Sequence, residues 1–363
     1  MTRAPSRDQL IAANEDAAEF YRRHLLGPDG AGPRRYLTQR GFATLLNDTP
    51  WTVGHAPATW TPLHDHLSEL GYSDEAQLGA GLTSISRRGH MIDRFRDRIT
   101  FGIRDQQDQL VGFTARTGPV GRDPKYLNTP RTDLFDKSAE LFGLGEATRS
   151  PAQTCVLVEG PLDAIAVTIA EPATAAQALC GTALTDKHAR LLRSASHEQL
   201  ILAFDGDPAG ARGLDNAASV MCDDRAVAVR RPQQDPAGFL ANEGPLALSA
   251  ALSSARPAAE VLLEAHLAKW PDRLDSAEAA IGCLREAATM IARIRPADVA
   301  ALATRLSHET RLPTLTVSTE LADALNSRDS TRMSSTSHRV DREHVALTHM
   351  DRWQTRSAPG PQR

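Results

Sequence analysis

Acidic residues at three places in the middle of the chain have the types and spacing of a divalent-metal site. Glu159 ends the apolar run that starts at Val156, and Asp163 follows four residues later. Asp205 and Asp207 end a second apolar run, and Asp235 precedes a proline. Hard cations such as Mg²⁺ take oxygen ligands of this kind and support phosphate chemistry. We therefore predict a Mg²⁺ site with these five acids as catalytic candidates.

Helix capping is the alternative interpretation of these acids. Asp207 and Asp235 each stand directly before a proline, as N-cap residues often do. Against this, an i, i+2 pair such as Asp205 and Asp207 points to one side of an extended chain and could share a metal. Carboxylates gathered at three strand ends also repel each other unless a cation neutralises them. The metal site is therefore favoured over capping alone.

The elements that would position these acids form an α/β unit at 151–250. Short apolar runs alternate with helical periodicity, which predicts a parallel sheet whose ligands bind at the carboxyl ends of its strands. We expect strands near 154–159, 174–179, 199–204 and 226–230, and helices near 161–170, 185–194, 209–221 and 236–242.

The segment 9–150 has the texture of a mixed α+β subdomain. Strand-like runs near 101–103 and 110–115 follow helical patterns, and cations are scattered among acids around them. A salt-bridged surface would explain those cations. The loop that carries Lys125, Tyr126 and Asn128 favours nucleic acid instead, because a cation, an aromatic ring and an amide can hold a phosphate backbone and stack a base.

The outer segments are simpler. Residues 1–8 are expected to be a flexible lead-in, and 255–325 have helical periodicity typical of a small bundle. The Ser/Thr/Arg/Asp-rich segment 326–363 is expected to be a disordered tail.

Composition excludes several classes. The 363 residues carry a net charge of −4, which disfavours indiscriminate coating of nucleic acid, so any such site must be a local basic patch. The four cysteines lie far apart, and the His64-Asp65-His66 triplet lacks a third ligand, so no zinc is expected. No apolar run approaches the roughly 20 residues of a membrane helix, and no signal peptide is evident, so we expect a cytoplasmic protein without membrane contact.

Several motifs in order resemble a known family. The segments 158–163 (Val-Glu-Gly-Pro-Leu-Asp) and 204–210 (Phe-Asp-Gly-Asp-Pro-Ala-Gly) resemble the Toprim signature of primases, topoisomerases and some nucleases. Three further segments restrict the resemblance to one of these families. They are 94–98 (Arg-Phe-Arg-Asp-Arg), 112–116 (Gly-Phe-Thr-Ala-Arg) and 124–130 (Pro-Lys-Tyr-Leu-Asn-Thr-Pro). Together with 36–41 and 101–105, they resemble the RNA-polymerase core of bacterial DnaG-type DNA primases from about residue 12 to 325.

This resemblance implies a three-part core that joins ribonucleotides on single-stranded DNA from ribonucleoside triphosphates. The parts would be a mixed N-terminal subdomain, a Toprim α/β domain and a helical bundle. The metal ligands for Mg²⁺ or Mn²⁺ would be Glu159, Asp205 and Asp207, supported by Asp163 and Asp235. The residues that would contact DNA are Arg94, Arg96, Arg116, Lys125, Tyr126, Asn128 and Lys137.

Three departures from the family pattern bear on partners. Zinc-binding Cys/His spacing is missing, Ala237 replaces the second aspartate of an Asp-Pro-Asp motif, and about 38 residues after Leu325 are few for a helicase-binding domain. Either a primase of a plasmid, phage or other mobile element or a core that works with a separate zinc-module protein would account for all three. A replicative helicase is the other expected partner.

Two other functions remain open on the sequence. A Toprim nuclease would use the same acids, whereas a topoisomerase would need a partner chain because all four tyrosines precede the acidic unit. A non-catalytic DNA-binding accessory is the third hypothesis, and the retained Glu159, Asp205 and Asp207 argue against it.

Overall fold

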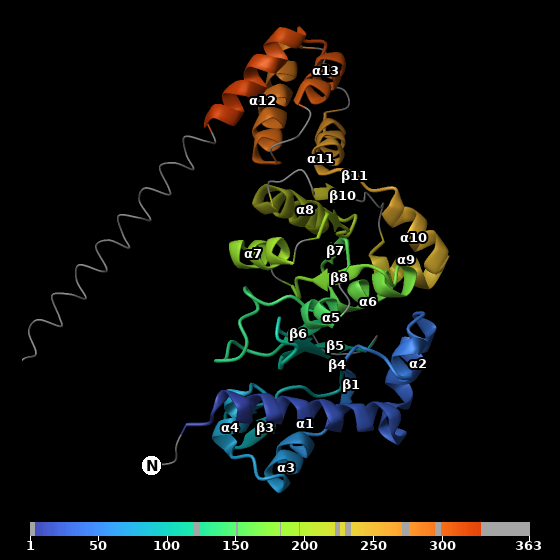
Figure 1. The fold of residues 1–363 in the computed structure, drawn as a ribbon, viewed down its shortest axis with the longest axis vertical. Helices are drawn as coiled ribbons and strands as arrows, with labels where there is room; N and C mark the ends of the chain where they lie inside the picture. The colour runs from blue at the N-terminus through green and yellow to red at the C-terminus, as the bar shows by residue number, and fades with distance from the viewer. Residues whose placement is uncertain are drawn as a thin grey trace, which may run out of the picture. The chain divides into compact units, whose positions relative to one another are not determined.

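The chain forms two compact units, Met1–Val261 and Leu262–Arg363. Figure 1 shows the computed structural model, in which every strand of the described residues belongs to the first unit. The residues that the structure describes are 4–118, 124–149, 152–181, 183–195, 197–221, 226–228, 234–270, 276–294 and 299–327.

An antiparallel sheet packed on one long helix forms the N-terminal part of the first unit. Helix α1 (Arg7–Leu26) begins with a capping box between Ser6 and Gln9. Its buried face packs on β1, where a Cβ added to Gly54 would lie 2.4 Å from Tyr21 Cβ, so only glycine lets the helix come this close. The sheet order is β1-β4-β5-β6. Its strands are β1 (Val53–Ala56), β4 (Arg98–Arg104), β5 (Leu110–Thr117) and β6 (Tyr126–Asn128).

Shorter elements complete this part and carry its connections. They are η1 (Pro28–Gly30), α2 (Ala31–Gln39), η2 (Ala43–Leu46), α3 (Pro62–Glu69), α4 (Asp74–Gly79), the hairpin strands β2 (Thr83–Ile85) and β3 (Met91–Asp93), and α5 (Leu144–Arg149).

The second sheet of the first unit has five strands in the order β11-β10-β9-β7-β8. Four neighbours run parallel, and only β11 is antiparallel. The central strands are buried on both faces and therefore consist of apolar residues without alternation. The strands are β7 (Thr154–Val158), β8 (Ala175–Ala178), β9 (Gln199–Leu202), β10 (Ala226–Ala228) and β11 (Arg256–Pro257). The helices that follow them are α6 (Pro161–Ala170), α7 (Asp186–Ser194), α8 (Pro208–Met221), α9 (Pro236–Glu243) and α10 (Pro245–Ser253).

The N-terminal part is joined to this sheet at the edge strand β8. Phe142 N donates to Ala178 O at 3.0 Å, and Ala178 N donates to Phe142 O at 2.9 Å. Phe142 also stacks on Trp51, with ring centroids 5.0 Å apart. The two sheets of the first unit are therefore held in one position by backbone and ring contacts together.

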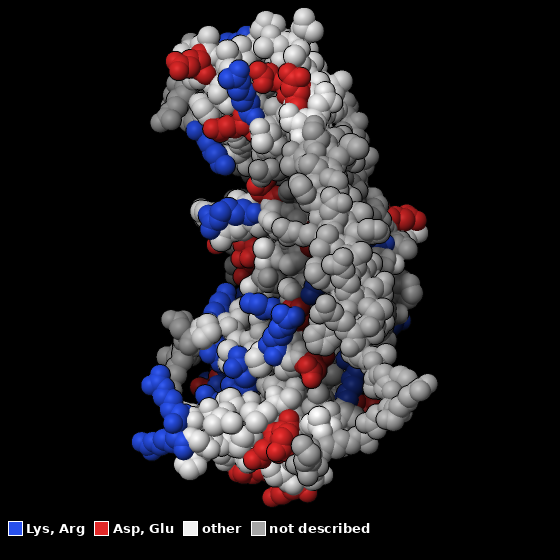
Figure 2. Space-filling view, turned by 90° about the vertical axis from the view of Figure 1, so that its left-hand side faces the viewer, with Lys and Arg blue, Asp and Glu red and all other residues white. Residues whose placement is uncertain are grey.

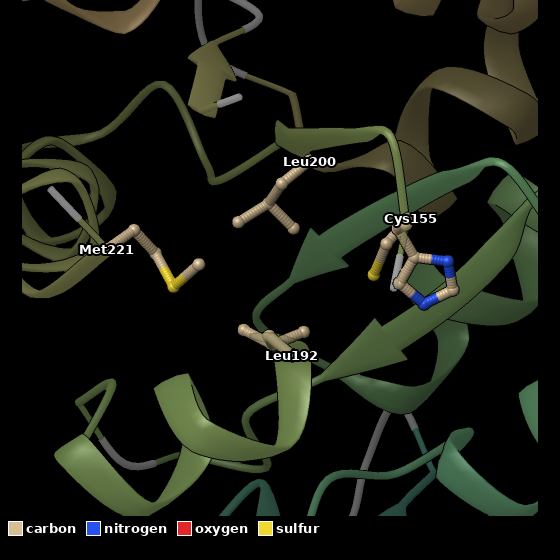
Figure 3. Close-up of a pocket in the computed structure, with 5 residues that line it drawn as sticks. Cys155, Leu192, Leu200 and Met221 are labelled. Carbon is tan, nitrogen blue, oxygen red and sulfur yellow. The ribbon is translucent and has the colours of Figure 1, made fainter. Parts of the chain in front are cut away.

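A small cavity of about 10 Å³ lies between the second sheet and the helices α7 and α8. Figure 3 shows its lining, to which Leu192 and Met221 come from helices and Cys155 and Leu200 from strands. A volume of this size holds at most one water. The cavity is a packing gap on one side of the sheet and cannot take a substrate.

The second unit is helical where it is described. Helix α11 (Ala258–Leu267) continues from the first unit and is followed by α12 (Ala277–Ile294), α13 (Val299–Thr310) and a helix at 314–327. Buried His266 contacts the carbonyl of Cys283 through Nε2 at 3.1 Å, and Arg305 pairs with Glu264 at 3.0 Å. These contacts tie α11 to α12 and α13.

The predicted fold class is confirmed: a mixed α+β part, a parallel α/β part and a helical part. Some boundaries were wrong. Residues 7 and 8 of the expected lead-in belong to α1 because Ser6 caps that helix, and residues 326 and 327 of the expected tail are helical. The strand expected at 199–204 ends at Leu202. Residues 229–230 of another expected strand and 328–363 of the tail lie outside the described residues.

None of the described helices is both long enough and apolar enough to cross a bilayer.

A buried carboxylate in α5 makes the stability of the first unit depend on pH. Neither carboxylate oxygen of Glu146 accepts a hydrogen bond from another described residue, and burial raises its pKa to about 7. The folded protein therefore keeps a proton that the unfolded chain has released, so its contribution to stability is lost as the pH rises from about 4.5 to about 7.

We predict that Glu146→Gln removes this loss. In urea unfolding at pH 5 and pH 8, the advantage of Glu146→Gln over wild type should grow by about 2–3 kcal/mol between the two pH values. The exposed Glu69→Gln serves as the control with no such change. Parallel pH dependence of Glu146→Gln and wild type would show that Glu146 ionises normally in the folded state.

Candidate active site

The carboxyl ends of two adjacent parallel strands bring the first acids together. Glu159 directly follows β7, and Asp205 comes three residues after β9, which is the neighbour of β7 in the sheet. Asp205 N donates to Glu159 Oε1 at 3.3 Å. The predicted juxtaposition of these two residues is therefore present in the structure.

Asp207 and Asp235 both cap helices. Asp207 Oδ1 accepts from the amides of Ala209 and Gly210 at 2.8 Å, and Asp235 Oδ1 accepts from Gly238 N at the start of α9. The prediction that Asp205 and Asp207 share one side of an extended strand was wrong, because β9 ends at Leu202 and Asp207 lies in the turn before α8. The second Asp207 oxygen is not used by these capping bonds.

Asp163 lies in the first turn of α6 and joins that helix to α9. Its side chain is nearly buried, and Oδ1 accepts from Ala237 N at 3.0 Å. The residue that replaces an expected aspartate thus contributes its backbone amide. Because its side chain is buried and bonded to α9, Asp163 is better placed to hold that helix than to contact a ligand.

The acids lower one another's tendency to ionise. Burial raises the pKa of Asp205 to about 6, and the charges of Glu159, Asp235 and Asp207 add to that rise. Burial also raises the pKa of Glu159, again with Asp207 and Asp235 adding to it. Burial and the charge of Asp235 raise the pKa of Asp163. A nearby cation would stabilise the ionised forms of these acids.

The residues fit a hard divalent cation by their chemistry. Asp205 Oδ1 is buried without a hydrogen-bond partner among the described residues, which is costly unless a donor or a cation satisfies it. Glu159, Asp205 and the second Asp207 oxygen are the groups that could hold the ion. In the arrangement seen here, no three acidic, His or Cys side chains of the described residues converge closely enough to do so. These side chains would have to turn toward the ion.

The strand β6 lies across from the acids and presents the aromatic and basic groups. A Cβ built on Gly160 would lie 3.5 Å from Tyr126 Oη and 2.9 Å from Asp163 Oδ2, so the Tyr126 hydroxyl and the Asp163 carboxylate both come close to Gly160. Burial and the charge of Asp163 raise the pKa of Tyr126. Exposed Lys125, whose Nζ lies 5.9 Å from the Tyr126 ring centroid, offsets a small part of the rise in the pKa values of Glu159, Asp163 and Asp205. Lys125 therefore lies close enough to these three acids to interact with their charges.

Asn128 and Arg94 form the next contact along β6. Arg94 Nη2 donates to Asn128 O at 3.0 Å, and Asn128 Nδ2 donates to Cys180 O at 2.9 Å. Cys180 lies two residues after the strand β8 and has a positive φ of 53°. Asn128 is thus a joint between the two sheets, and its buried Oδ1 has no partner among the described residues.

Arg96 and Lys137, two other residues predicted to contact DNA, lie outside β6. Arg96 stacks on the half-exposed ring of Trp60, with Cζ 4.6 Å from the ring centroid. Lys137 is exposed, and its backbone carbonyl accepts from buried His188 of α7. No contact among the described residues links the Lys137 side chain to the acids.

Two aromatic residues of this region were not predicted. Tyr36 of α2 lies against Arg116, with Arg116 Cζ 4.9 Å from the Tyr36 ring centroid, and Trp60 lies under Arg96. An aromatic residue at an amphipathic position looks like a core residue in the sequence, so no local pattern distinguishes it. The pairing with an arginine appears only in the fold.

Basic side chains gather on one face of the first unit. In Figure 2, Lys and Arg side chains cluster at the height of the β4, β5 and β6 strands of Figure 1. Part of the cluster is salt-bridged, as the alternative interpretation expected, since Arg104 pairs with Glu15 and Arg149 with Asp108. Arg94, Arg116 and Lys125 take part in none of the ion pairs found among the described residues. Arg116 and Lys125 lie near the Tyr126 ring, and Arg94 donates to the Asn128 carbonyl of the same strand.

The acids lie at the carboxyl ends of a parallel sheet beside an antiparallel sheet that carries basic residues, and this arrangement is that of a Toprim-type protein. Family comparisons agree. Residues 20–148 match the N-terminal domain of the DNA primase catalytic core, and residues 156–240 match a Toprim-like domain.

Relatives are found among primases. The chain is 36% identical over 304 residues to a DNA primase of Mycolicibacterium smegmatis, covering 80% of this chain and 47% of that protein. It resembles the RNA polymerase domain of Mycobacterium tuberculosis primase DnaG in complex with double-stranded DNA, with a TM-score of 0.71 and 32% identity over 85% of this chain and 99% of that one. It also resembles a DnaG primase catalytic domain bound to ssDNA, with a TM-score of 0.70 and 26% identity over 85% of this chain and 98% of that one.

The chain belongs to the catalytic-core family of bacterial DnaG-type DNA primases. It spans about half the length of the curated primases that it matches.

The orphaned oxygen of Asp205 yields a prediction on metal binding. Mn²⁺ should raise the stability of the wild-type protein, by about 2.7 kcal/mol at a concentration of 100 Kd. Asp205→Asn should bind Mn²⁺ at least about tenfold more weakly and lose about half of that gain, because a charged ligand is gone. Thermal unfolding with and without Mn²⁺ measures both.

The exposed Asp186→Asn is the matched control, since it removes the same charge from a helix start elsewhere in the sheet unit. Equal Mn²⁺ responses of Asp205→Asn and Asp186→Asn would remove Asp205 from the metal site.

Proposed function

We propose that this chain is a primase catalytic core that synthesises short RNA primers on single-stranded DNA by metal-dependent nucleotidyl transfer. The observation that carries the proposal is the group formed by Glu159, Asp205 and Asp207 opposite Lys125 and Tyr126. Family membership, and the DNA complexes of similar catalytic domains, support the same reaction.

The acidic side of the site would hold the metal. Glu159, Asp205 and Asp207 are the proposed ligands of Mg²⁺ or Mn²⁺, and Asp235 is a further one. A bound ion of this kind orients a triphosphate, promotes attack by a 3′-hydroxyl and stabilises the departing pyrophosphate. Asp163 fixes α9, and with it Asp235, through its bond to Ala237 N. The pKa values of Asp205 and Glu159 are raised because their ionised forms are destabilised, and the positive charge of the ion would offset this.

The basic side would hold the nucleic acid. Lys125 and Arg116 offer donors to phosphate oxygens, and the Tyr126 ring offers a face at the acidic edge. Arg94 and Asn128 continue this side, and Arg96 on Trp60 offers a stacked cation and ring beyond them. Lys137 is proposed as a further phosphate contact. Contacts of this kind bind single strands with little sequence preference.

The proposed partners follow from the reaction. They are a single-stranded DNA template and ribonucleoside triphosphates, with a replicative helicase or a separate zinc-module protein to direct initiation. The proposed place of action is the cytoplasm.

Hydrolysis of DNA by the same acids is the second candidate function. The metal site alone would serve it equally well. The juxtaposition of Tyr126, Lys125 and Arg116 with the acids favours synthesis, because a template strand and an incoming nucleotide must be held side by side.

Primer synthesis is the direct test. With labelled ribonucleotides, single-stranded DNA and Mg²⁺ or Mn²⁺, the wild type should make short RNA. Asp205→Asn and Asp207→Asn should each reduce synthesis by at least about 100-fold, an effect of the size expected when a group that stabilises transition-state charge is lost. The assay is run with and without an added zinc-module protein.

A wild type that makes no RNA under either condition contradicts the proposal. Metal-dependent cleavage of the DNA without synthesis would establish the nuclease function in its place.

A second prediction concerns Lys125. Lys125→Ala should weaken binding to single-stranded DNA at low salt, and the slope of log affinity against log salt should fall by about one unit. Fluorescence anisotropy over a salt series measures this slope. Lys269→Ala, which removes an exposed lysine from the second unit, should leave the slope unchanged. An unchanged slope for Lys125→Ala would exclude a phosphate contact by this residue.

A further inference from the structure

The guanidinium of Arg116 lies between two phenol rings that come from different parts of the N-terminal sheet region. Its Cζ is 4.9 Å from the ring centroid of Tyr36 and 5.9 Å from that of Tyr126. Tyr36 belongs to α2 and Tyr126 to β6, and β6 pairs with β5 so that Tyr126 is opposite Arg116 itself. One ring is thus supplied by the strand next to Arg116, and the other only by α2.

Hydrogen bonds do little to fix this guanidinium. The only bond found for it among the described residues is a long one, in which Nη1 donates to Thr117 O at 3.4 Å. Nε is buried without a hydrogen-bond partner among those residues, and none of their ion pairs includes Arg116. The faces of the two rings are therefore the main constraint on its orientation.

Helix α2 is itself anchored where it can serve this purpose. Arg34 Nη1 donates to Leu25 O at 2.6 Å, which ties the start of α2 to the end of α1. A Cβ built on Gly41, just after α2, would lie 3.6 Å from the Leu240 side chain of α9. Because Asp235 caps α9, the turn after α2 lies against the same helix that an acid of the site caps.

Arg116 keeps its donors for a ligand. Tyr126, its second ring, reaches the acidic edge at Gly160, and the Tyr36 hydroxyl is also buried without a partner among the described residues. Unused guanidinium donors beside an acidic metal site suit a phosphoryl oxygen, which accepts strong charge-assisted hydrogen bonds.

We propose that Tyr36 is a positioning residue that holds the Arg116 guanidinium toward a phosphoryl oxygen at the acidic edge of the parallel sheet. This inference rests on the proposed function for the identity of the ligand. The phosphoryl oxygen belongs either to the backbone of single-stranded DNA or to the triphosphate of a ribonucleotide, and the ring of Tyr36, not its hydroxyl, does the positioning.

A double-mutant cycle on binding tests this. The variants are Tyr36→Leu, Tyr36→Phe, Arg116→Gln and the double variant Tyr36→Leu/Arg116→Gln. Anisotropy with labelled single-stranded DNA in the absence of nucleotide is one arm, and calorimetric binding of ATP with Mg²⁺ is the other. The arm that responds identifies the source of the phosphate.

In at least one arm, Tyr36→Leu should weaken binding about fivefold to tenfold, as expected from the loss of a partly buried cation–π contact. Tyr36→Phe should restore binding to within about twofold of wild type, since it keeps the ring. In the Arg116→Gln background, Tyr36→Leu should have no further effect, because its only route to the ligand is gone.

Additive losses in the double variant would overturn the proposal, because they would mean that Tyr36 acts independently of Arg116 or through general stability. An unchanged affinity of Arg116→Gln in both arms would overturn it as well. Coupled losses in binding by a protein that makes no primers would leave the role of Tyr36 intact and reject the primase function, so the two failures can be told apart.

Discussion

The mutual repulsion of carboxylates at one sheet edge is the constraint to which the rest of the first unit responds. Parallel strands place Glu159 and Asp205 side by side, and burial makes each charge costly. The fold offsets part of that cost with helix amides, which satisfy Asp207, Asp235 and Asp163. Among the described residues, nothing satisfies Asp205 Oδ1. Stability is given up at an oxygen that could help to hold a cation, as is common at functional sites.

The basic sheet is useful only because it is fixed relative to that edge. Asn128 reaches Cys180, Phe142 pairs with Ala178, and Tyr126 approaches Gly160. Each contact links a residue of the N-terminal part to the end of a strand or the start of a helix in the parallel sheet. A template held by the first part would therefore keep its distance from a metal held by the second, which is what a positioned reaction requires.

Local chemistry in the sequence was sufficient to predict the parallel sheet, the two central strands of the antiparallel sheet, most helices and the proximity of Glu159 to Asp205. Apolar runs and helix caps act within a few residues, so they can be recognised without the fold. The failures were of another kind. The end of β9 at Leu202 depends on its pairing with β7, and the roles of Tyr36 and Trp60 depend on arginines that lie far away in the chain. Ala237 was interpreted as the loss of an acidic residue, yet its backbone amide donates to Asp163. A backbone contact of this kind does not depend on the residue type, so the sequence does not reveal it.

The pairing of Phe142 with β8 also bears on solubility. Strand β8 (Ala175–Ala178) is the last strand of the parallel sheet and carries no charged residue, and an open strand of that kind can pair with another molecule. The two hydrogen bonds between Phe142 and Ala178 close part of this edge, while Pro257 in β11 blunts the opposite one. A fragment that begins after residue 150 would expose β8 and gain a route to edge-to-edge aggregation. The N-terminal part thus acts as a built-in guard for the sheet that carries the acids.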